Sequence, residues 1–345
     1  MTTTSETINL TASVERSNAT CLSDQLLGLG EQVGERYVIE GVLGKGGMGM
    51  VYRALDVWTG KAVALKTPLP RVLHVDGVRQ RFEFEFAVAS ALSGPHSVRV
   101  LEQGVHESQG IELPWMAMEL LRGETLRARL KRCGRLNQRQ ALSLLLQLLE
   151  AMSEAHAHGV IHQDLKPENI FLCATPDGRQ LVKVLDYGIA AIIPERWRGP
   201  LPPYDCSARV MGTPAYMAPE QRTAKMPTEA VDVYALGCIT YHMLMGKLPY
   251  EAATLMSMAT AHGSKPLPRL EGLLASTSLE RFVHRAMAKR PTRRFGTVLH
   301  MAEALRKITA PSSTELSRFI PAPRPTRPRR PMYLRPACTT VHAFA

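Results

Sequence analysis

Four polar residues in the middle of the chain have the types and spacing that phosphoryl transfer requires. Residues 162–170 read His-Gln-Asp-Leu-Lys-Pro-Glu-Asn-Ile, and an Asp-Tyr-Gly sequence follows further on. Asp164 could accept a hydroxyl proton, and Lys166 carries a positive charge two positions later. Asn169 and Asp186 offer the hard oxygen ligands that Mg²⁺ prefers, with Mn²⁺ as an alternative. Because catalysis of phosphoryl transfer rests on positioning and on neutralising phosphate charge, this set predicts that chemistry.

A glycine-rich segment upstream could hold phosphates. Residues 44–49 read Gly-Lys-Gly-Gly-Met-Gly and lie between two segments that alternate as β-strands do, 37–43 and 50–55. A dinucleotide-binding fold needs such a motif to open a helix, and a P-loop needs Gly-Lys-Ser/Thr, which is absent. Two interpretations remain, a turn whose backbone N–H groups approach nucleotide phosphates and an ordinary flexible hairpin. Val51 and the strand-like residues 63–66 favour the first.

Lys66 ends that strand-like segment among apolar neighbours, so we expect a partly buried ammonium. A buried cation needs an acidic partner or its charge is lost. The helix-like segment 81–92 offers Glu83 and Glu85, which lie about 200° apart around a helix. At most one of them can therefore face Lys66, and the alternative is that both are solvated surface acids.

In combination these motifs resemble those of the protein kinase superfamily, and most closely those of bacterial eukaryotic-like serine/threonine kinases. The resemblance covers roughly residues 37–308. It implies an α+β fold of two lobes, with a small, mostly β N-lobe containing one helix at 37–120 and a larger, mostly helical C-lobe at 121–310. It also implies Mg²⁺-dependent transfer of the γ-phosphoryl group of ATP to serine or threonine of protein substrates, with ATP in the cleft between the lobes.

The same resemblance assigns catalytic roles. Asp164 is expected to orient and deprotonate the substrate hydroxyl, and Lys166 to neutralise the transferring group. Asn169 and Asp186 are expected to coordinate the metal. Glu85 takes the place of the glutamate that pairs with the conserved lysine of the family, so we choose it as the partner of Lys66.

The resemblance also implies contacts with the nucleotide. Met118 is expected behind the adenine, with the Glu119 carbonyl and the Leu121 amide at its edge, and without the resemblance this stretch reads as an edge strand. Phe171 is expected under the adenine ring. The whole expected nucleotide site comprises Leu43, Gly44, Lys45, Gly46, Gly47, Met48, Gly49, Val51, Ala64, Lys66, Glu85, Met118, Glu119, Leu121 and Phe171.

Two residues depart from the family pattern. Gln163 stands where the family commonly has an arginine that pairs with a phosphorylated residue of the activation segment. We hypothesise that activation here does not depend on that pairing, and loss of most activity in Ser207→Ala would contradict this. Tyr187 replaces the usual phenylalanine, an exchange that should keep the aromatic packing.

The activation segment is expected between Asp186 and Glu220, where Ser207 and Thr213 are the Ser/Thr candidates for phosphorylation. Residues 212–220 closely resemble the serine/threonine-kinase ending of this segment. The resemblance implies that the Thr213 hydroxyl bonds the catalytic aspartate and lysine. Thr213 is therefore read as structural, and serine/threonine specificity is favoured over tyrosine specificity.

Three further residues are expected to support the fold. By resemblance, Asp232 holds the backbone of the catalytic loop, and Arg294 forms an ion pair with Glu220. Loss of one member of such a buried pair would cost on the order of 3–5 kcal/mol.

Substrate preference and the alternatives to a kinase also follow from particular residues. Glu124 and Glu168 occupy places where relatives meet basic side chains upstream of the target, so we predict basic flanks in the protein substrates. The alternative is a pseudokinase or nucleotide-binding scaffold acting through its tails. It is disfavoured because the lysine, the base and both metal ligands are present.

Composition indicates a cytoplasmic protein with a large core. The chain has 345 residues, 45% of them hydrophobic, and no run approaches the eighteen apolar residues of a membrane span. A basic, then apolar secretory signal is absent after Met1. The six cysteines are scattered without a Cys-x-x-Cys pair, which favours reduced thiols over a disulfide framework or a zinc site.

The two ends are expected to be disordered. Residues 1–36 are rich in Thr, Ser, Glu and Gly and read as a disordered leader. Residues 311–345 carry six Arg against one Glu, and with their prolines they read as an extended basic tail. The tail could be merely solvated, or could dock an acidic or SH3-like partner. A nucleic-acid-binding role rests on this tail alone and is not favoured.

Overall fold

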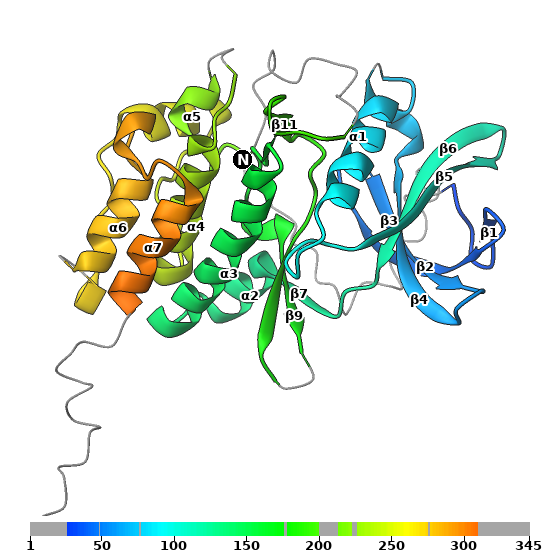
Figure 1. Cartoon of the computed structure of the whole chain (residues 1–345), viewed down its shortest axis with the longest axis horizontal. Coiled ribbons are helices and arrows are strands. Elements are labelled where there is room, and N and C mark those ends of the chain that lie inside the picture. Colours follow the sequence, from blue (N-terminus) through cyan, green and yellow to red (C-terminus); the bar gives the residue numbers. More distant parts are fainter. Residues whose placement is uncertain are drawn as a thin grey trace, which may run out of the picture. The chain divides into compact units, whose positions relative to one another are not determined.

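A six-stranded antiparallel sheet forms the small lobe of the computed structural model (Figure 1). Its strand order is β1-β2-β3-β4-β6-β5. The strands are β1 (Gln32–Val33), β2 (Tyr37–Lys45), β3 (Gly49–Asp56), β4 (Lys61–Pro68), β5 (Val100–Ser108) and β6 (Ile111–Glu119). The structure describes residues 26–47, 49–75, 77–175, 178–199, 213–222, 226–274 and 277–309.

The β3–β4 hairpin sets the register of the residues around the cleft. Its turn contains Gly60 at φ 67°, a conformation that glycine adopts without strain. The Asp56 carboxylate accepts hydrogen bonds from the Trp58 amide at 3.1 Å and the Thr59 hydroxyl at 2.7 Å. The resulting pairing places Val51 opposite Lys66.

Residues 26–36 belong to the small lobe, so the predicted leader is wrong for this part of the chain. Leu27 is fully buried and packs in the same core as Tyr37 and Trp115. Strand β1 pairs with the start of β2, and Glu31 accepts a hydrogen bond from the Ser108 hydroxyl at 3.0 Å. Burial of this short apolar patch outweighs the polar composition around it. Residues 1–25 and the tail at 311–345 lie outside the described residues.

Helix α1 (Val78–Ala91) packs beside the sheet of the small lobe (Figure 1). It buries Phe82, Phe84, Glu85 and Val88. A short 3-10 helix, η1 (Pro70–Val72), precedes it. The helix therefore carries one buried acid among aromatic side chains.

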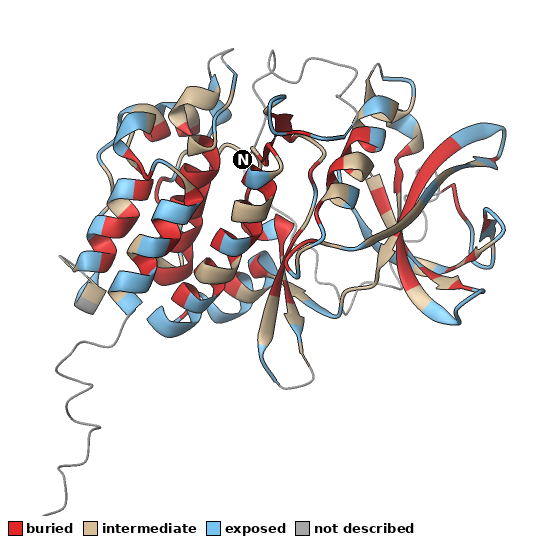
Figure 2. Ribbon diagram, viewed as in Figure 1, coloured by how far each residue is buried: buried red, intermediate tan, exposed pale blue. Residues whose placement is uncertain are grey.

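Helices make up most of the large lobe. They are α2 (Leu126–Cys133), α3 (Gln138–Ala157), α4 (Ala230–Met245), α5 (Leu255–Ser264), α6 (Ser278–Ala286) and α7 (Val298–Thr309). Helix α4 is buried all round from Val231 to Leu244, and Figure 2 shows it at the centre of the helical layer. A helix that is hydrophobic on all faces is the expected core of such a bundle. Helix α3 begins with a capping box between Asn137 and Gln140.

Short strands and 3-10 turns of the large lobe carry the loops next to the cleft. A three-stranded sheet has the order β10-β9-β7, with β7 (Gly123–Thr125), β9 (Ile170–Ala174) and β10 (Gln180–Val184). Strands β8 (Val160–Ile161) and β11 (Ala191–Ile192) form a second small sheet. The 3-10 helices are η2 (Pro167–Asn169), η4 (Pro219–Arg222), η5 (Gly272–Leu274) and η6 (Pro291–Arg293).

The predicted two-lobed α+β architecture is confirmed, with a strand-rich small lobe and a helical large lobe. The chain passes from one to the other between the end of β6 and the start of β7. In the described part of the chain, no helix has both the length and the apolar character needed to cross a membrane.

Candidate active site

A cleft of about 740 Å³ opens between the two lobes. Its size is typical of a site for a small organic ligand. Of the residues predicted from the sequence, it is lined by Leu43, Gly46, Gly47, Gly49, Val51, Ala64, Lys66, Glu85, Met118, Glu119, Leu121, Asp164, Lys166, Asn169, Phe171 and Asp186. Gly44 and Lys45 lie in β2 but do not line it, and Met48 lies outside the described residues.

The glycine-rich turn covers the cleft from the small lobe. The Gly46 amide donates a hydrogen bond to the Gly49 carbonyl at 2.8 Å, which closes the turn. A Cβ atom on Gly49 would lie 2.9 Å from the Thr67 carbonyl oxygen, closer than real side chains approach. Glycine is therefore required there so that β3 can lie against β4 at the edge of the cavity.

Lys66 reaches two carboxylates at the back of the cleft. Its ammonium lies 2.5 Å from Glu85 Oε1 and 3.6 Å from Asp186 Oδ1. Burial opposes the charge of Lys66, but the two carboxylates outweigh it and raise the pKa of this lysine. Glu83, by contrast, is exposed on α1. Helix α1 thus presents Glu85, and not Glu83, to the lysine.

Asp164 is held by hydrogen bonds on both carboxylate oxygens. Oδ1 accepts bonds from the amide and the hydroxyl of Thr213, each at 2.7 Å. Oδ2 accepts one from Lys166 Nζ at 2.5 Å, and Lys166 also donates to the Thr213 hydroxyl at 3.0 Å. The carboxylate is therefore fixed in orientation with a cation beside it, and it lines the cleft.

Asn169 and Asp186 offer oxygens that fit a divalent metal ion. The Asn169 side-chain amide donates through Nδ2 to the Asp164 carbonyl at 3.0 Å, which leaves Oδ1 for another partner. Half of the Asp186 side chain is exposed, and the nearby Lys66 lowers its pKa, so it is an anion at neutral pH. Among the described residues no three His, Cys, Asp or Glu side chains gather as a closed metal site. An open pair of oxygen ligands suits Mg²⁺, which commonly completes its shell with water and substrate phosphates.

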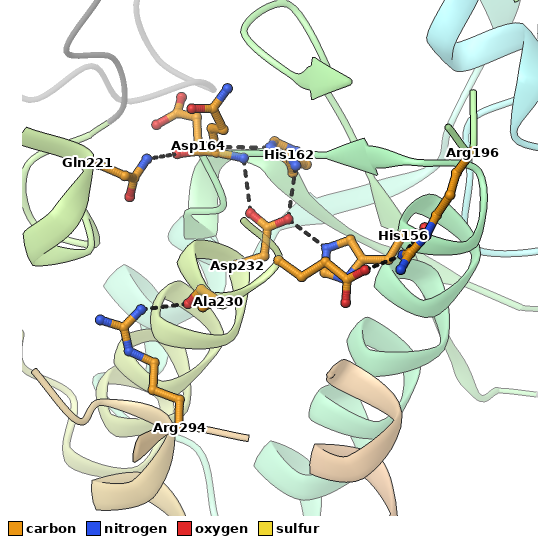
Figure 3. A network of polar contacts seen from close by, with 10 residues as sticks. His156, His162, Asp164, Arg196, Gln221, Ala230, Asp232 and Arg294 are labelled. Atoms are coloured by element: carbon orange, nitrogen blue, oxygen red, sulfur yellow. Dashed lines mark hydrogen bonds and ion pairs between the residues drawn. The ribbon is translucent and has the colours of Figure 1, made fainter. Parts of the chain in front are cut away.

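Asp232 on α4 supports the loop that carries Asp164 (Figure 3). Its carboxylate is fully buried and accepts hydrogen bonds from the His162 amide at 2.9 Å and the Gln163 amide at 3.0 Å. It also pairs with His156 Nε2 at 2.8 Å. Burial lowers the pKa of His156, but Asp232 and Glu229 together raise it to about 9. A buried imidazolium therefore balances the aspartate that positions the catalytic loop.

Arg294 holds the end of the activation segment against α4. Its guanidinium makes a two-point contact with Glu220, at 2.5 and 2.8 Å. It also donates to the Ala230 carbonyl at 2.7 Å (Figure 3). The Arg294 side chain is 0% exposed. These bonds fasten η4 to the bundle, while Ser207 lies outside the described residues.

Sequence reasoning missed the contacts that three polar residues make around the cleft and the catalytic loop. His156 on α3 pairs with Asp232. Lys183 on β10 donates to Glu119 Oε1 at 2.7 Å and to the Ser97 carbonyl at 2.8 Å. Gln163 donates from its side chain to the Ile189 carbonyl at 3.0 Å. A lysine among valines just before Asp186 was the available signal for Lys183.

Comparison with known proteins gives one family. Residues 37–307 match the protein kinase domain. The chain is 35% identical over 300 residues to the serine/threonine-protein kinase pkn3 of Myxococcus xanthus, which covers 86% of this chain and 53% of that protein. It is 34% identical over 283 residues to the serine/threonine-protein kinase PknB of Mycobacterium leprae, covering 79% of this chain and 43% of that protein. The chain thus spans about half the length of these curated relatives or less.

Proposed function

We propose, from the premise that this chain belongs to the protein kinase family, that it transfers the γ-phosphoryl group of ATP to serine or threonine side chains of proteins. The observation that carries the proposal is the convergence of Lys66, Glu85, Asp164 and Asp186 on one cavity. These residues come from both lobes and are widely separated in sequence. Phosphoryl transfer needs such a set of anchored charges, because positioning and neutralisation supply most of the catalysis.

ATP would occupy the cleft with its adenine between the lobes. Ala64 and Val51 on one side and Phe171 on the other supply apolar contact, and the backbone at Glu119 and Leu121 supplies the polar edge. The glycine-rich turn and Lys66 face the phosphates. Asn169 and Asp186 would hold Mg²⁺, which would supply positive charge against the phosphates.

Asp164 would accept the proton of the substrate hydroxyl while the hydroxyl oxygen forms a bond to the γ-phosphorus of ATP. The bond between the γ-phosphorus and the oxygen that links it to the β-phosphorus breaks, and ADP leaves with that oxygen. Lys166 lies beside Asp164 and offers its charge to the transferred group. Thr213 bonds both residues, so it orients the base towards the entering hydroxyl. A nucleotide-binding scaffold without transfer is not favoured, because all the groups that act are present.

Activation without an arginine–phosphate pair is supported by the contacts of Gln163. The Gln163 side chain donates a hydrogen bond to the Ile189 carbonyl at the start of the activation segment. The Gln163 backbone carbonyl accepts one from Gln221 Nε2 at 2.9 Å. The loop and both ends of the segment are thus joined through neutral hydrogen bonds. A cytoplasmic location, and a partner for residues 311–345, stay predictions from the sequence.

The test is transfer of label from γ-labelled ATP to one acidic and one basic protein substrate, by the wild-type chain and by Asp164→Asn. Loss of the general base should lower kcat by about 10²-fold or more. Binding of a fluorescent ATP analogue should persist in Asp164→Asn, because Asp164 is not among the residues expected to bind the nucleotide. A wild-type chain that binds nucleotide but labels neither protein nor itself would refute the proposed function.

A further inference from the structure

The two acids expected to meet basic substrates are already engaged by arginines of this chain. Glu124 Oε1 accepts hydrogen bonds from Arg129 Nε at 2.5 Å and from Arg132 Nη2 at 2.6 Å. The hydrogen bonds of the two arginines lower the pKa of Glu124 against the opposing effect of burial. Its carboxylate is therefore ionised and surrounded by positive charge before any substrate arrives.

Glu168 is paired in the same way, close to the catalytic loop. Its Oε1 lies 3.5 Å from Arg127 Nε. Burial and the Glu168 charge raise the pKa of Tyr216, and the Arg127 charge opposes this. Glu168 is four residues from Asp164, which limits their Cα separation to about 14 Å. The pair therefore lies close enough to Asp164 to meet a substrate bound there.

Positive charge exceeds negative charge along residues 122–132, which we call the rim. Residues 122–132, which cover the start of the large lobe and α2, contain five Arg or Lys and one acid. The cations are Arg122, Arg127, Arg129, Lys131 and Arg132. Glu168 adds a second acid from the neighbouring η2, which packs against α2. Even with both acids counted, the rim carries an excess of cations.

Two arginines on this rim are exposed enough to exchange partners. The Arg127 and Arg132 side chains are 54% and 61% exposed. Ion pairs at that exposure are weak in water, because solvent screens them and long side chains lose freedom on pairing. A carboxylate on a substrate can therefore share or take these guanidinium groups, whereas a substrate lysine or arginine finds Glu124 and Glu168 neutralised and further cations beside them.

We propose that this rim, made by Arg122, Arg127, Arg129, Lys131 and Arg132, selects protein substrates with aspartate or glutamate near the target hydroxyl. Extended chain advances about 3.3 Å per residue, so the acidic residues should lie within about four positions of the target. The inference rests on the proposed kinase function and reverses the preference for basic flanks predicted from the sequence. Guanidinium groups suit it because their planar donors match carboxylates.

The experiment compares three peptides that share one target serine and differ only in flanks of Glu, Gln or Lys. Wild type should show a kcat/KM for the Glu peptide about tenfold above that for the Lys peptide, the effect expected of two or three exposed charge contacts. The difference should appear mainly in KM and shrink as salt rises from 0.05 to about 0.5 M, because these contacts are exposed.

A double variant, Arg127→Gln with Arg132→Gln, frees Glu168 and part of Glu124. The Glu/Lys preference should fall to parity or reverse. The matched control is Arg281→Gln with Lys307→Gln, which removes two exposed positive charges from α6 and α7 and should keep the wild-type preference. Thermal melting of both variants checks that they fold.

The possible outcomes separate the two proposals. A wild-type preference for the Lys peptide, equal use of all three peptides, or an unchanged preference in the Arg127→Gln, Arg132→Gln variant each overturns acidic selection while leaving kinase activity in place. A wild type that phosphorylates no peptide and no protein overturns the kinase function, and acidic selection with it.

Discussion

Lys183 should position the backbone that we propose to meet the adenine. Its side chain is 11% exposed and bridges the Ser97 carbonyl and the Glu119 carboxylate, at the end of β6. The Glu119 carboxylate also accepts a hydrogen bond from the Arg99 amide at 2.8 Å. Lys183→Met keeps the apolar stem of the side chain and removes the charge. The variant therefore leaves one carbonyl and one carboxylate short of a donor while the packing is preserved.

The size of the effect follows from burial. A hydrogen bond to a charged group contributes about 1.5–3 kcal/mol, and the Glu119 side chain, 27% exposed, recovers part of this from water. We expect Lys183→Met to lose about 2 kcal/mol of unfolding free energy in total. If about 1.4 kcal/mol of this loss also weakens ATP binding, KM for ATP rises tenfold, while kcat for the bound complex changes little.

The assay combines urea unfolding with steady-state kinetics at varied ATP. Lys247→Met is the matched control, because Lys247 Nζ also lies 2.7 Å from a carboxylate, that of Glu271, but on an exposed surface. It should leave both readouts unchanged. If Lys183→Met loses stability as expected and KM for ATP stays within twofold of wild type, Lys183 supports the fold without positioning the nucleotide.

Two further predictions concern buried ion pairs of the large lobe. Because the pKa of His156 is raised from 6.5 to about 9, its pairing with Asp232 stabilises the fold fully below pH 6.5 and is lost as pH rises through 9. The urea midpoints of wild type and His156→Gln should therefore differ at pH 6 and converge towards pH 9.5, and a constant difference would contradict the titration. Arg294→Met should cost about 3–5 kcal/mol of unfolding free energy, because it strands Glu220 and removes a bond to a buried carbonyl. Glu220→Gln, which keeps a hydrogen-bond acceptor at a side chain 25% exposed, should cost less in the same urea titration.

Much of the cleft could be predicted because its residues are defined by type and spacing. The turn at residues 44–49 joins β2 to β3, and the next hairpin pairs β3 with β4, which carries Lys66; contacts within such hairpins follow from nearby sequence. A buried lysine also needs an acid, which left only a few partners on the next helix. The family resemblance then selected Glu85, and the structure places Glu85 against Lys66.

Other features depend on segments that are distant in the chain. The Leu26–Leu27 patch reads as part of a polar leader until β5 and β6 provide the surface that buries it. Lys183 and Glu119 are 64 positions apart, and no local pattern links them. The pairing of Glu168 with Arg127 likewise required α2 to pack beside the catalytic loop.

The physical reason for this division is the reach of the interactions. Backbone turns, strand alternation and helix caps are set by neighbouring residues, so residue order alone predicts them. A charged side chain on a long flexible stem can meet several partners, and the packing of remote elements selects among them. For that reason the sequence alone predicted the residues that carry the chemistry. The sign of the charge around the incoming substrate could be inferred only from the folded structure.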